Sequence, residues 1–394
     1  MVATPMDAPL DSSGGRPRRL RRLAFRLALS LALGLISLEL LLRFLLIGSS
    51  DLALRLGEPL RRPELFSDPH AGEDYWKLRA RFDRAPPAEP HPLFHPLLGW
   101  CKLAVDPQTY RHRFEVYLRG RAPLLFFGDS FTACLTGPEE CWEGLLERSE
   151  FGRELCILNY GTGSYGLDQI LLLLRSALPA YAEARPRVVV GILVDDDLDR
   201  AMTGLREYPK PRFELEGDEL VLRPPERAPP LAYAMEHPLG GTSYLWRFFV
   251  FGSELVPPAR RGSWMLDAGF RAREEALGRR LLQEIQRAAA PLDPGFFVIL
   301  FHGEEALAAS EIPWQERFLE QALHELAIPF VSSRRELAAD AARTGRTPGS
   351  YFLRDGKDVH HYPAETNAIV FGTLARGLRR EFERRGHSGS ASGR

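Results

Sequence analysis

The feature that most constrains the fold is an alternation of short apolar runs with helical patterns from residue 123 onward. The runs are rich in Val, Ile, Leu and Phe without polar alternation, which is typical of strands buried on both faces. Such strands alternating with helices imply a parallel sheet covered by helices. The expected strands are residues 124–127, 155–159, 188–194, 296–301 and 328–332. The expected helices are residues 139–149, 167–183, 267–289, 313–326 and 365–384.

One segment, residues 203–258, interrupts this alternation. It contains a predicted hairpin of residues 213–215 against 220–222, followed by a proline-rich stretch. Insertions of this kind at the carboxyl edge of a sheet often form a lid or a substrate wall. The alternative is an ordinary surface insertion with no role in a site.

The N-terminal region carries a second strong signal, an apolar run at residues 27–47. As a helix its 21 residues span about 31 Å, close to the thickness of a bilayer core. Six arginines precede it, so by the positive-inside rule the tail 1–26 stays cytoplasmic and the rest of the chain is exported. Glu39 and Arg43 oppose this interpretation, although their spacing allows them to pair on one helix face. The prediction is an uncleaved signal anchor; a cleaved signal peptide and a buried soluble helix are the alternatives.

The remaining organisation follows from composition. A net charge of -1 argues against a general nucleic-acid binder. Residues 48–120 are predicted to be a spacer and lead-in, with an extended proline-rich run at 85–100. The main domain is expected at residues 121–386, followed by a disordered tail at 387–394.

Four cysteines are too few for a disulfide framework, and they lack the paired spacing of a zinc site. Outside the cytoplasm Cys134 and Cys141 can bridge across the intervening turn, and four unpaired apolar thiols are the alternative. No metal site and no cofactor is predicted.

Candidate chemistry lies where the strands end, because ligands bind at the carboxyl ends of parallel strands. The first strand runs into Gly128-Asp129-Ser130, which places a serine hydroxyl above the sheet on a tight turn. The second ends in a loop with three glycines, whose open N–H groups suit an oxyanion site. The third ends in an acidic block that begins at Asp195.

The last motif is Asp358-Val359-His360-His361, before the final helix. An aspartate three residues before a histidine can orient its imidazole, which leaves the other ring nitrogen able to take a proton from a serine.

These four blocks in this order resemble the SGNH (GDSL-type) hydrolase family. The likeness covers residues 96–386, including Gly99-Trp100 and Gln169. It implies a three-layer α/β/α fold with a five-stranded parallel sheet, and ester hydrolysis or acyl transfer through an acyl-serine.

Carried onto this sequence, the resemblance implies Ser130 as nucleophile, His361 as general base and Asp358 as the residue that orients it. The oxyanion donors would be the N–H groups of Ser130 and Gly161.

The sequence departs from the family at Asp196, which stands where an asparagine normally donates to the oxyanion. A carboxylate cannot donate, and losing one such donor costs about 10²–10³ in rate. Three options follow: neighbouring acids keep Asp196 protonated, another group replaces it, or activity is low. Alternatively, the acids point into solvent and align differently.

Other polar residues near these motifs have competing interpretations. His360 is the alternative general base, whereas His302 is expected to be a structural histidine. Arg200 and Lys210 can meet an anionic substrate or be ordinary surface cations.

The sequence therefore predicts a membrane-anchored serine esterase of bacterial type, with its catalytic domain in the periplasm or outside the cell. Its expected substrates are acyl (acetyl) esters of envelope or exported carbohydrate. Two alternatives stay open: an O-acyltransferase with the same triad, and a non-catalytic glycan-binding or assembly subunit.

Overall fold

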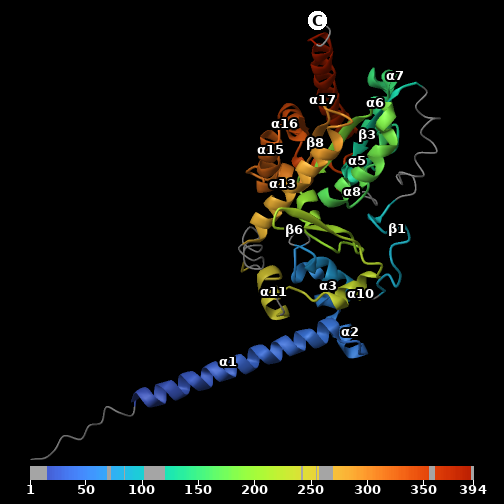
Figure 1. Ribbon diagram of the computed structural model, residues 1–394. Coiled ribbons are helices and arrows are strands. Elements are labelled where there is room, and N and C mark those ends of the chain that lie inside the picture. The colour runs from blue at the N-terminus through green and yellow to red at the C-terminus, as the bar shows by residue number, and fades with distance from the viewer. Residues whose placement is uncertain are drawn as a thin grey trace, which may run out of the picture.

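A five-stranded parallel sheet forms the centre of the main domain in the computed structural model (Figure 1). The described residues are 16–68, 72–83, 85–101, 120–240, 243–253, 255–256, 269–354 and 360–391. The strand order is β4-β3-β5-β8-β9, and all four neighbouring pairs are parallel. Chain order therefore reverses between β3 and β5, the switch point where such sheets bind ligands.

The strands of this sheet are β3 (Ala122–Phe127), β4 (Leu155–Asn159), β5 (Arg187–Leu193), β8 (Phe297–Phe301) and β9 (Phe330–Ser332). All five predicted strands are confirmed, with ends displaced by two residues at most. The predicted three-layer α/β/α class is also confirmed.

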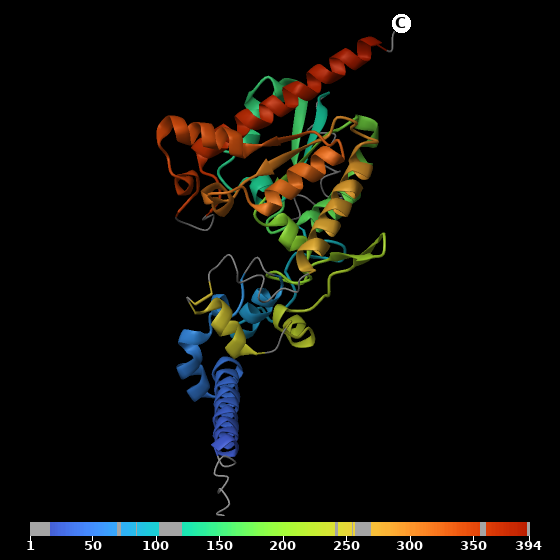
Figure 2. The same cartoon turned by 90° about the vertical axis from the view of Figure 1, so that its left-hand side faces the viewer.

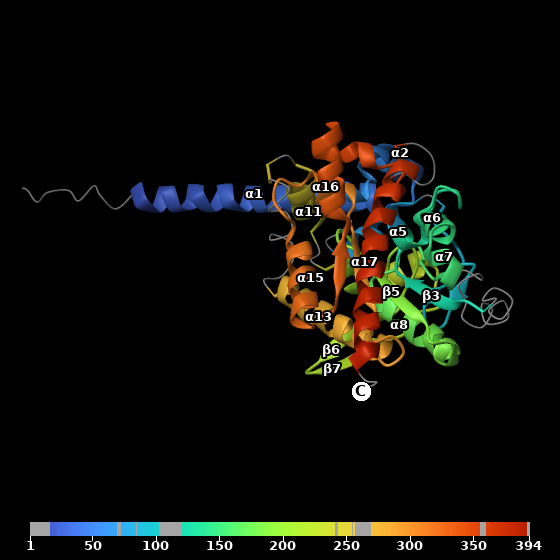
Figure 3. The ribbon, with the colours of Figure 1, turned by 90° about the horizontal axis from the view of Figure 1, so that it is seen from above.

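Helices cover both faces of the sheet (Figures 2 and 3). One face packs against α8 (Leu167–Ala177), α13 (Phe270–Ala289) and α15 (Trp314–Glu325). The other packs against α6 (Trp142–Arg148), α7 (Phe151–Glu154), α16 (Ser333–Thr344) and α17 (Ala364–Ala391). Alternate residues of β3 contribute to opposite cores, as the two-residue period of a strand requires.

Shorter elements complete the described chain. Those before the sheet are α1 (Arg16–Ile47), α2 (Asp51–Gly57), η1 (Glu58–Leu60), η2 (Pro63–Leu65), α3 (Asp74–Phe82), β1 (Phe94–His95) and β2 (Gly99–Trp100). Those that follow β3 along the chain are α5 (Ser130–Ala133), η3 (Leu178–Ala184), α9 (Asp197–Ala201), β6 (Arg212–Glu216), β7 (Glu219–Arg223), α10 (Pro230–Glu236), α11 (Tyr244–Phe251), α14 (Glu304–Ala308) and η4 (Pro348–Tyr351).

The predicted hairpin is confirmed as β6 and β7, in the register Phe213↔Leu222 and Leu215↔Leu220. Residues 387–391 of the tail predicted to be disordered belong to α17, which continues to Ala391, and residues 392–394 lie outside the described residues. Cys134 and Cys141 form a disulfide, with their Cα atoms 5.9 Å apart.

The segment predicted to be a spacer is largely folded. At the base of the domain, α3 lies beside α10, α2 packs against the end of α1, and α1 also contacts α11 (Figures 1 and 2). Phe66, Leu78 and Phe82 from this segment form a small core with Tyr244 of α11. The insertion therefore completes a second packing unit with the segment that precedes the sheet.

The end of α1 belongs to this small core. Leu42 and Leu46 are buried in it, and Arg61 donates to the carbonyls of Leu45 at 3.1 Å and Gly48 at 2.7 Å. Most earlier side chains of α1 are exposed, and Leu20–Ile47 is long and apolar enough to cross a membrane.

The two charged residues of the apolar run, Glu39 and Arg43, contact the domain or each other. Glu39 accepts hydrogen bonds from the N–H groups of Tyr244 at 3.1 Å and Leu245 at 2.8 Å, and Arg43 pairs with Glu39 at 2.8 Å. Glu39 thus caps α11, because the first N–H groups of a helix lack partners within the helix. The charges that weaken the apolar run serve to dock α1 on the domain.

We expect Leu46→Ala to destabilise the full chain by about 2–5 kcal/mol, because it opens a cavity where the helix docks. Leu41→Ala is the matched control: Leu41 is 50% exposed and Leu46 is fully buried, so its effect should stay within about 0.5 kcal/mol. Urea unfolding in detergent, followed by near-ultraviolet circular dichroism, measures both. Equal losses for the two variants would contradict this docking.

Candidate active site

The turn after β3 sets the position of Ser130. Asp129 caps the short helix α5 by accepting the N–H of Phe131 at 2.9 Å, and Ser130 is the first residue of that helix. Gly128 admits no side chain, since a Cβ there would lie 1.9 Å from Thr132 Oγ1. The result is a serine at the carboxyl end of β3 with 9% of its surface exposed.

His361 meets this serine. Its Nε2 lies 2.9 Å from Ser130 Oγ, although 231 residues separate the two in the chain. The imidazole packs near the ring of Phe131, and the carbonyl of His361 accepts the N–H of Leu353 at 2.8 Å. His360 instead points to Glu304, with 3.6 Å between Nδ1 and Oε2. Of the two neighbouring histidines, the structure therefore brings His361 to the serine.

Asp358, predicted to orient the histidine, lies outside the described residues. Its role stays a prediction.

The glycine loop after β4 is fixed by Asn159. The Asn159 amide donates to the carbonyl of Thr132 and to Glu143, both at 2.8 Å. Asn159 Oδ1 accepts the N–H of Gly161 at 2.8 Å. The predicted oxyanion donor Gly161 is thus engaged within its own loop. Its glycine identity has a packing reason, because a Cβ there would lie 2.2 Å from the backbone nitrogen of Ala133.

Two other N–H groups face the same region. A Cβ at Gly163 would lie 4.0 Å from Ser130 Cβ, so this glycine is adjacent to the serine. Across the described part of the chain, the N–H groups of Ser130 and Gly163 make no hydrogen bond to the protein. These two N–H groups are therefore open to a ligand, whereas the N–H of Gly161 is engaged by Asn159.

A buried arginine organises the acidic block. Arg200 Nη1 donates to Asp129, Asp197 and the carbonyl of Tyr165, each at 3.0 Å. Burial and the nearby Asp129 raise the pKa of Asp197 well above its usual range, and attraction to Arg200 opposes this shift. The guanidinium is 5% exposed, so Arg200 supports the turn that carries Ser130 and is not a surface cation for substrate.

The closest charged partners of Asp196 are arginines, whereas one option from the sequence was that neighbouring acids keep it protonated. Its carboxylate pairs with Arg200 and lies 3.6 Å from Arg206 Nη2. Two guanidinium groups stabilise the charged form of a carboxylate. Asp195 points away and accepts the N–H groups of Gly303 at 2.8 Å and Ala306 at 2.9 Å. Asp196 is thus ion-paired with Arg200 and close to Arg206.

His302 is a structural histidine, as predicted. It is fully buried, with Nδ1 2.9 Å from Ser333 Oγ and Nε2 3.0 Å from Glu316 Oε1. Although burial opposes it, hydrogen bonds from His302 and Arg334 lower the pKa of Glu316 to about 2.

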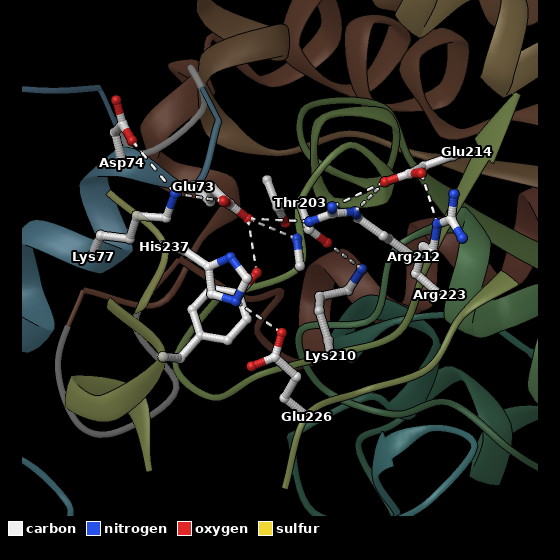
Figure 4. A network of polar contacts seen from close by, with 12 residues as sticks. Glu73, Asp74, Lys77, Thr203, Lys210, Arg212, Glu214, Arg223, Glu226 and His237 are labelled. Carbon is white, nitrogen blue, oxygen red and sulfur yellow. Dashed lines mark hydrogen bonds and ion pairs between the residues drawn. The ribbon is translucent and has the colours of Figure 1, made fainter. Parts of the chain in front are cut away.

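Lys210 is also an internal residue (Figure 4). Its ammonium pairs with Asp168 of α8 and donates to the carbonyls of Thr203 at 3.1 Å and Pro211 at 2.9 Å. Both charged side chains are fully buried. Burial raises the pKa of Asp168 and lowers that of Lys210, and the attraction between the two opposes both shifts. Lys210 ties the start of the insertion to the helix behind the glycine loop and is not available to a substrate.

The sequence alone does not predict the roles of Asn159, Gly163 and Trp100. The Trp100 indole N–H donates to the carbonyl of Gly163 at 3.3 Å, and the Gln169 amide donates to the carbonyl of Leu98 at 2.7 Å. The one available signal was the position of Asn159 at the end of a buried strand, where a polar side chain can bond to the neighbouring loops.

Together the fold and site define an α/β protein with a serine–histidine contact at the switch point of its sheet. No family model matches the sequence, and no curated protein matches it.

Solved structures give weak similarities. One is LAE5, an α/β hydrolase from the metagenome of Lake Arreo, with a TM-score of 0.38 and 11% identity over 65% of this chain and 94% of that one. Another is Axe2, an acetylxylan esterase from Geobacillus stearothermophilus, with a TM-score of 0.36 and 15% identity over 66% and 93%. These values do not place the chain in a family.

Proposed function

We propose that this protein is a serine ester hydrolase with Ser130 as nucleophile and His361 as general base. The observation that carries the proposal is the 2.9 Å contact between Ser130 Oγ and His361 Nε2 at the carboxyl end of β3. Contact of a serine with a histidine base is the arrangement that activates a hydroxyl for acyl transfer. Asp358 is proposed as the group that orients His361.

The proposed reaction has two halves. His361 takes the proton from Ser130 while Oγ attacks the ester carbonyl carbon, and the tetrahedral intermediate collapses to an acyl-serine. The departing alcohol takes the proton from His361. Water then gives a proton to His361 and attacks the acyl-serine, which releases the carboxylic acid and restores the hydroxyl.

The oxyanion site is proposed to consist of the N–H groups of Ser130 and Gly163. Ser130 carries the reacting oxygen and Gly163 is adjacent to this serine, and backbone donors stabilise negative charge without any change in protonation. Asp196 takes no part as a donor. Through Arg200 it helps to hold Asp129 and hence the turn.

The proposed location is the outer side of a membrane, with α1 as a single-pass anchor. The exposed apolar side chains of α1 and the arginines of its first turns support this orientation. The proposed substrates are acyl esters of carbohydrate.

Ser130→Ala tests the proposed function. The full chain in detergent should hydrolyse p-nitrophenyl acetate, and the variant should lose this activity by a factor on the order of 10⁴–10⁶. Ser176→Ala, at an exposed position of α8, is the control for a lost hydroxyl and should fold and hydrolyse the ester. Hydrolysis that survives in Ser130→Ala would rule out this nucleophile.

A further inference from the structure

A hollow of about 290 Å³ lies beside the proposed nucleophile and has no role in the mechanism above. Its wall includes Gly163, the glycine adjacent to Ser130, together with Thr162 and Ser164 from the same loop. The rest of its lining comes from the lead-in, with His91, Leu93 and Trp100, and from the turn after α9, with Glu207 and Tyr208. Segments far apart in the chain therefore enclose one space next to the site.

Three aromatic rings form one side of this hollow. His91 and Tyr208 meet edge to face with their ring centroids 4.7 Å apart, and the centroid of Trp100 is 6.0 Å from that of His91. Nδ1 of His91 accepts the N–H of Leu93 at 3.0 Å, which leaves Nε2 as the donor of the neutral ring. Burial lowers the pKa of His91, although the charge on Glu207 opposes this shift.

The aromatic wall is anchored rigidly to the glycine loop. The indole N–H of Trp100 donates to Gly163, and the hydroxyl of Tyr165 donates to the carbonyl of Trp100. The buried ion pair of Lys210 and Asp168 fixes the chain just after Tyr208. A site held this way is pre-organised, which lowers the entropic cost of binding.

The polar groups of the hollow identify the class of ligand. Ser164 and Thr162 carry hydroxyls, and Glu207 carries a carboxylate that lies 3.5 Å from Arg79 at the rim. An alkyl chain would cover the Ser164 hydroxyl without offering it a partner, at a cost, whereas the Thr162 hydroxyl already donates to the carbonyl of Tyr160. A sugar ring matches both halves of the lining, because its hydroxyls bond to polar groups while its C–H faces pack on aromatic rings.

We propose that this hollow binds the sugar ring on the alcohol side of the ester, so that an acyl group on that ring reaches Ser130. The inference deepens the proposed function and rests on it. It assigns to His91 and Tyr208 the choice of a carbohydrate over a simple alcohol, whereas Ser130 and His361 carry out the chemistry.

The test compares peracetylated methyl glycosides of xylose, glucose, mannose and N-acetylglucosamine with p-nitrophenyl acetate. For the best glycoside, Tyr208→Ala should lower the ratio of its kcat/KM to that of p-nitrophenyl acetate by about tenfold, mainly through KM. Tyr208→Phe should restore most of the ratio, because the ring provides the contact. Trp246→Ala, an exposed aromatic on α11, should leave the ratio unchanged.

An unchanged ratio in Tyr208→Ala, with p-nitrophenyl acetate still hydrolysed, would overturn the sugar site and leave the proposed function intact. If the wild type hydrolyses no ester, saturation-transfer NMR with the same glycosides decides the binding claim separately. Binding that weakens about tenfold in Tyr208→Ala supports the sugar site, and equal or absent binding contradicts it.

Discussion

Replacing His361 with alanine is expected to lower kcat/KM for ester hydrolysis by a factor on the order of 10⁴–10⁶. The imidazole is the group in contact with Ser130 Oγ, so its loss leaves the serine as an unactivated alcohol. Initial rates with p-nitrophenyl acetate measure the loss. Circular dichroism confirms that the variant is folded.

His360→Ala is the matched control for this experiment. The two histidines are adjacent, but the His360 side chain is 68% exposed and lies near Glu304. Its removal should change the rate by about twofold at most, since surface substitutions rarely disturb a fold. A large loss in His360→Ala with a small one in His361→Ala would reverse the assignment of the base.

Lys210→Met is expected to destabilise the protein by about 3–5 kcal/mol, because it leaves the buried Asp168 carboxylate without its partner. The double variant Lys210→Met/Asp168→Leu should recover much of the loss, since apolar residues of similar size often replace a buried ion pair without cost. The midpoint and slope of urea unfolding give the free energy of each variant.

Arg223→Met is the control for the removal of a cation from the same region (Figure 4). Arg223 pairs with Glu214 and Glu216, but its side chain is 47% exposed. An exposed ion pair contributes little to stability because solvent screens it, so this loss should be small. Similar losses for Lys210→Met and Arg223→Met would contradict the structural role of the buried pair.

The fold was predictable because its signal is local. Runs such as residues 155–159 are apolar at every position, as strands covered on both faces must be. Residues 167–183 read as one helical pattern, and they form α8 followed directly by η3. The hairpin was equally predictable from local sequence, since its turn includes Gly217, where φ is +63°.

The small core around the end of α1 was not predictable in the same way. Glu39 binds the start of α11 more than 200 residues later. Nothing near Glu39 in the sequence identifies that partner, so the charge appeared only as a defect in an apolar run. The segment at residues 48–120 appeared to be a spacer for the same reason.

In the site, the sequence located the motifs but not the partners of their side chains. The strand ends and the Asp-x-x-His spacing pointed to Ser130 and His361, and the structure brings these two together. The hydrogen bond that engages the Gly161 N–H depends on the side-chain rotamer of Asn159, which the spacing of residues in the sequence does not determine. The ion pairing of Asp196 likewise depends on its distance to Arg206 across a turn.

The most direct test of the central claim is to treat the full chain with a fluorophosphonate and map the modified peptide by mass spectrometry. Such reagents phosphonylate a serine that a neighbouring base has activated. The proposed site predicts one adduct per chain on Ser130, lost when His361 is replaced by alanine. An unmodified Ser130 in folded protein, or an adduct that forms equally well without His361, would contradict it.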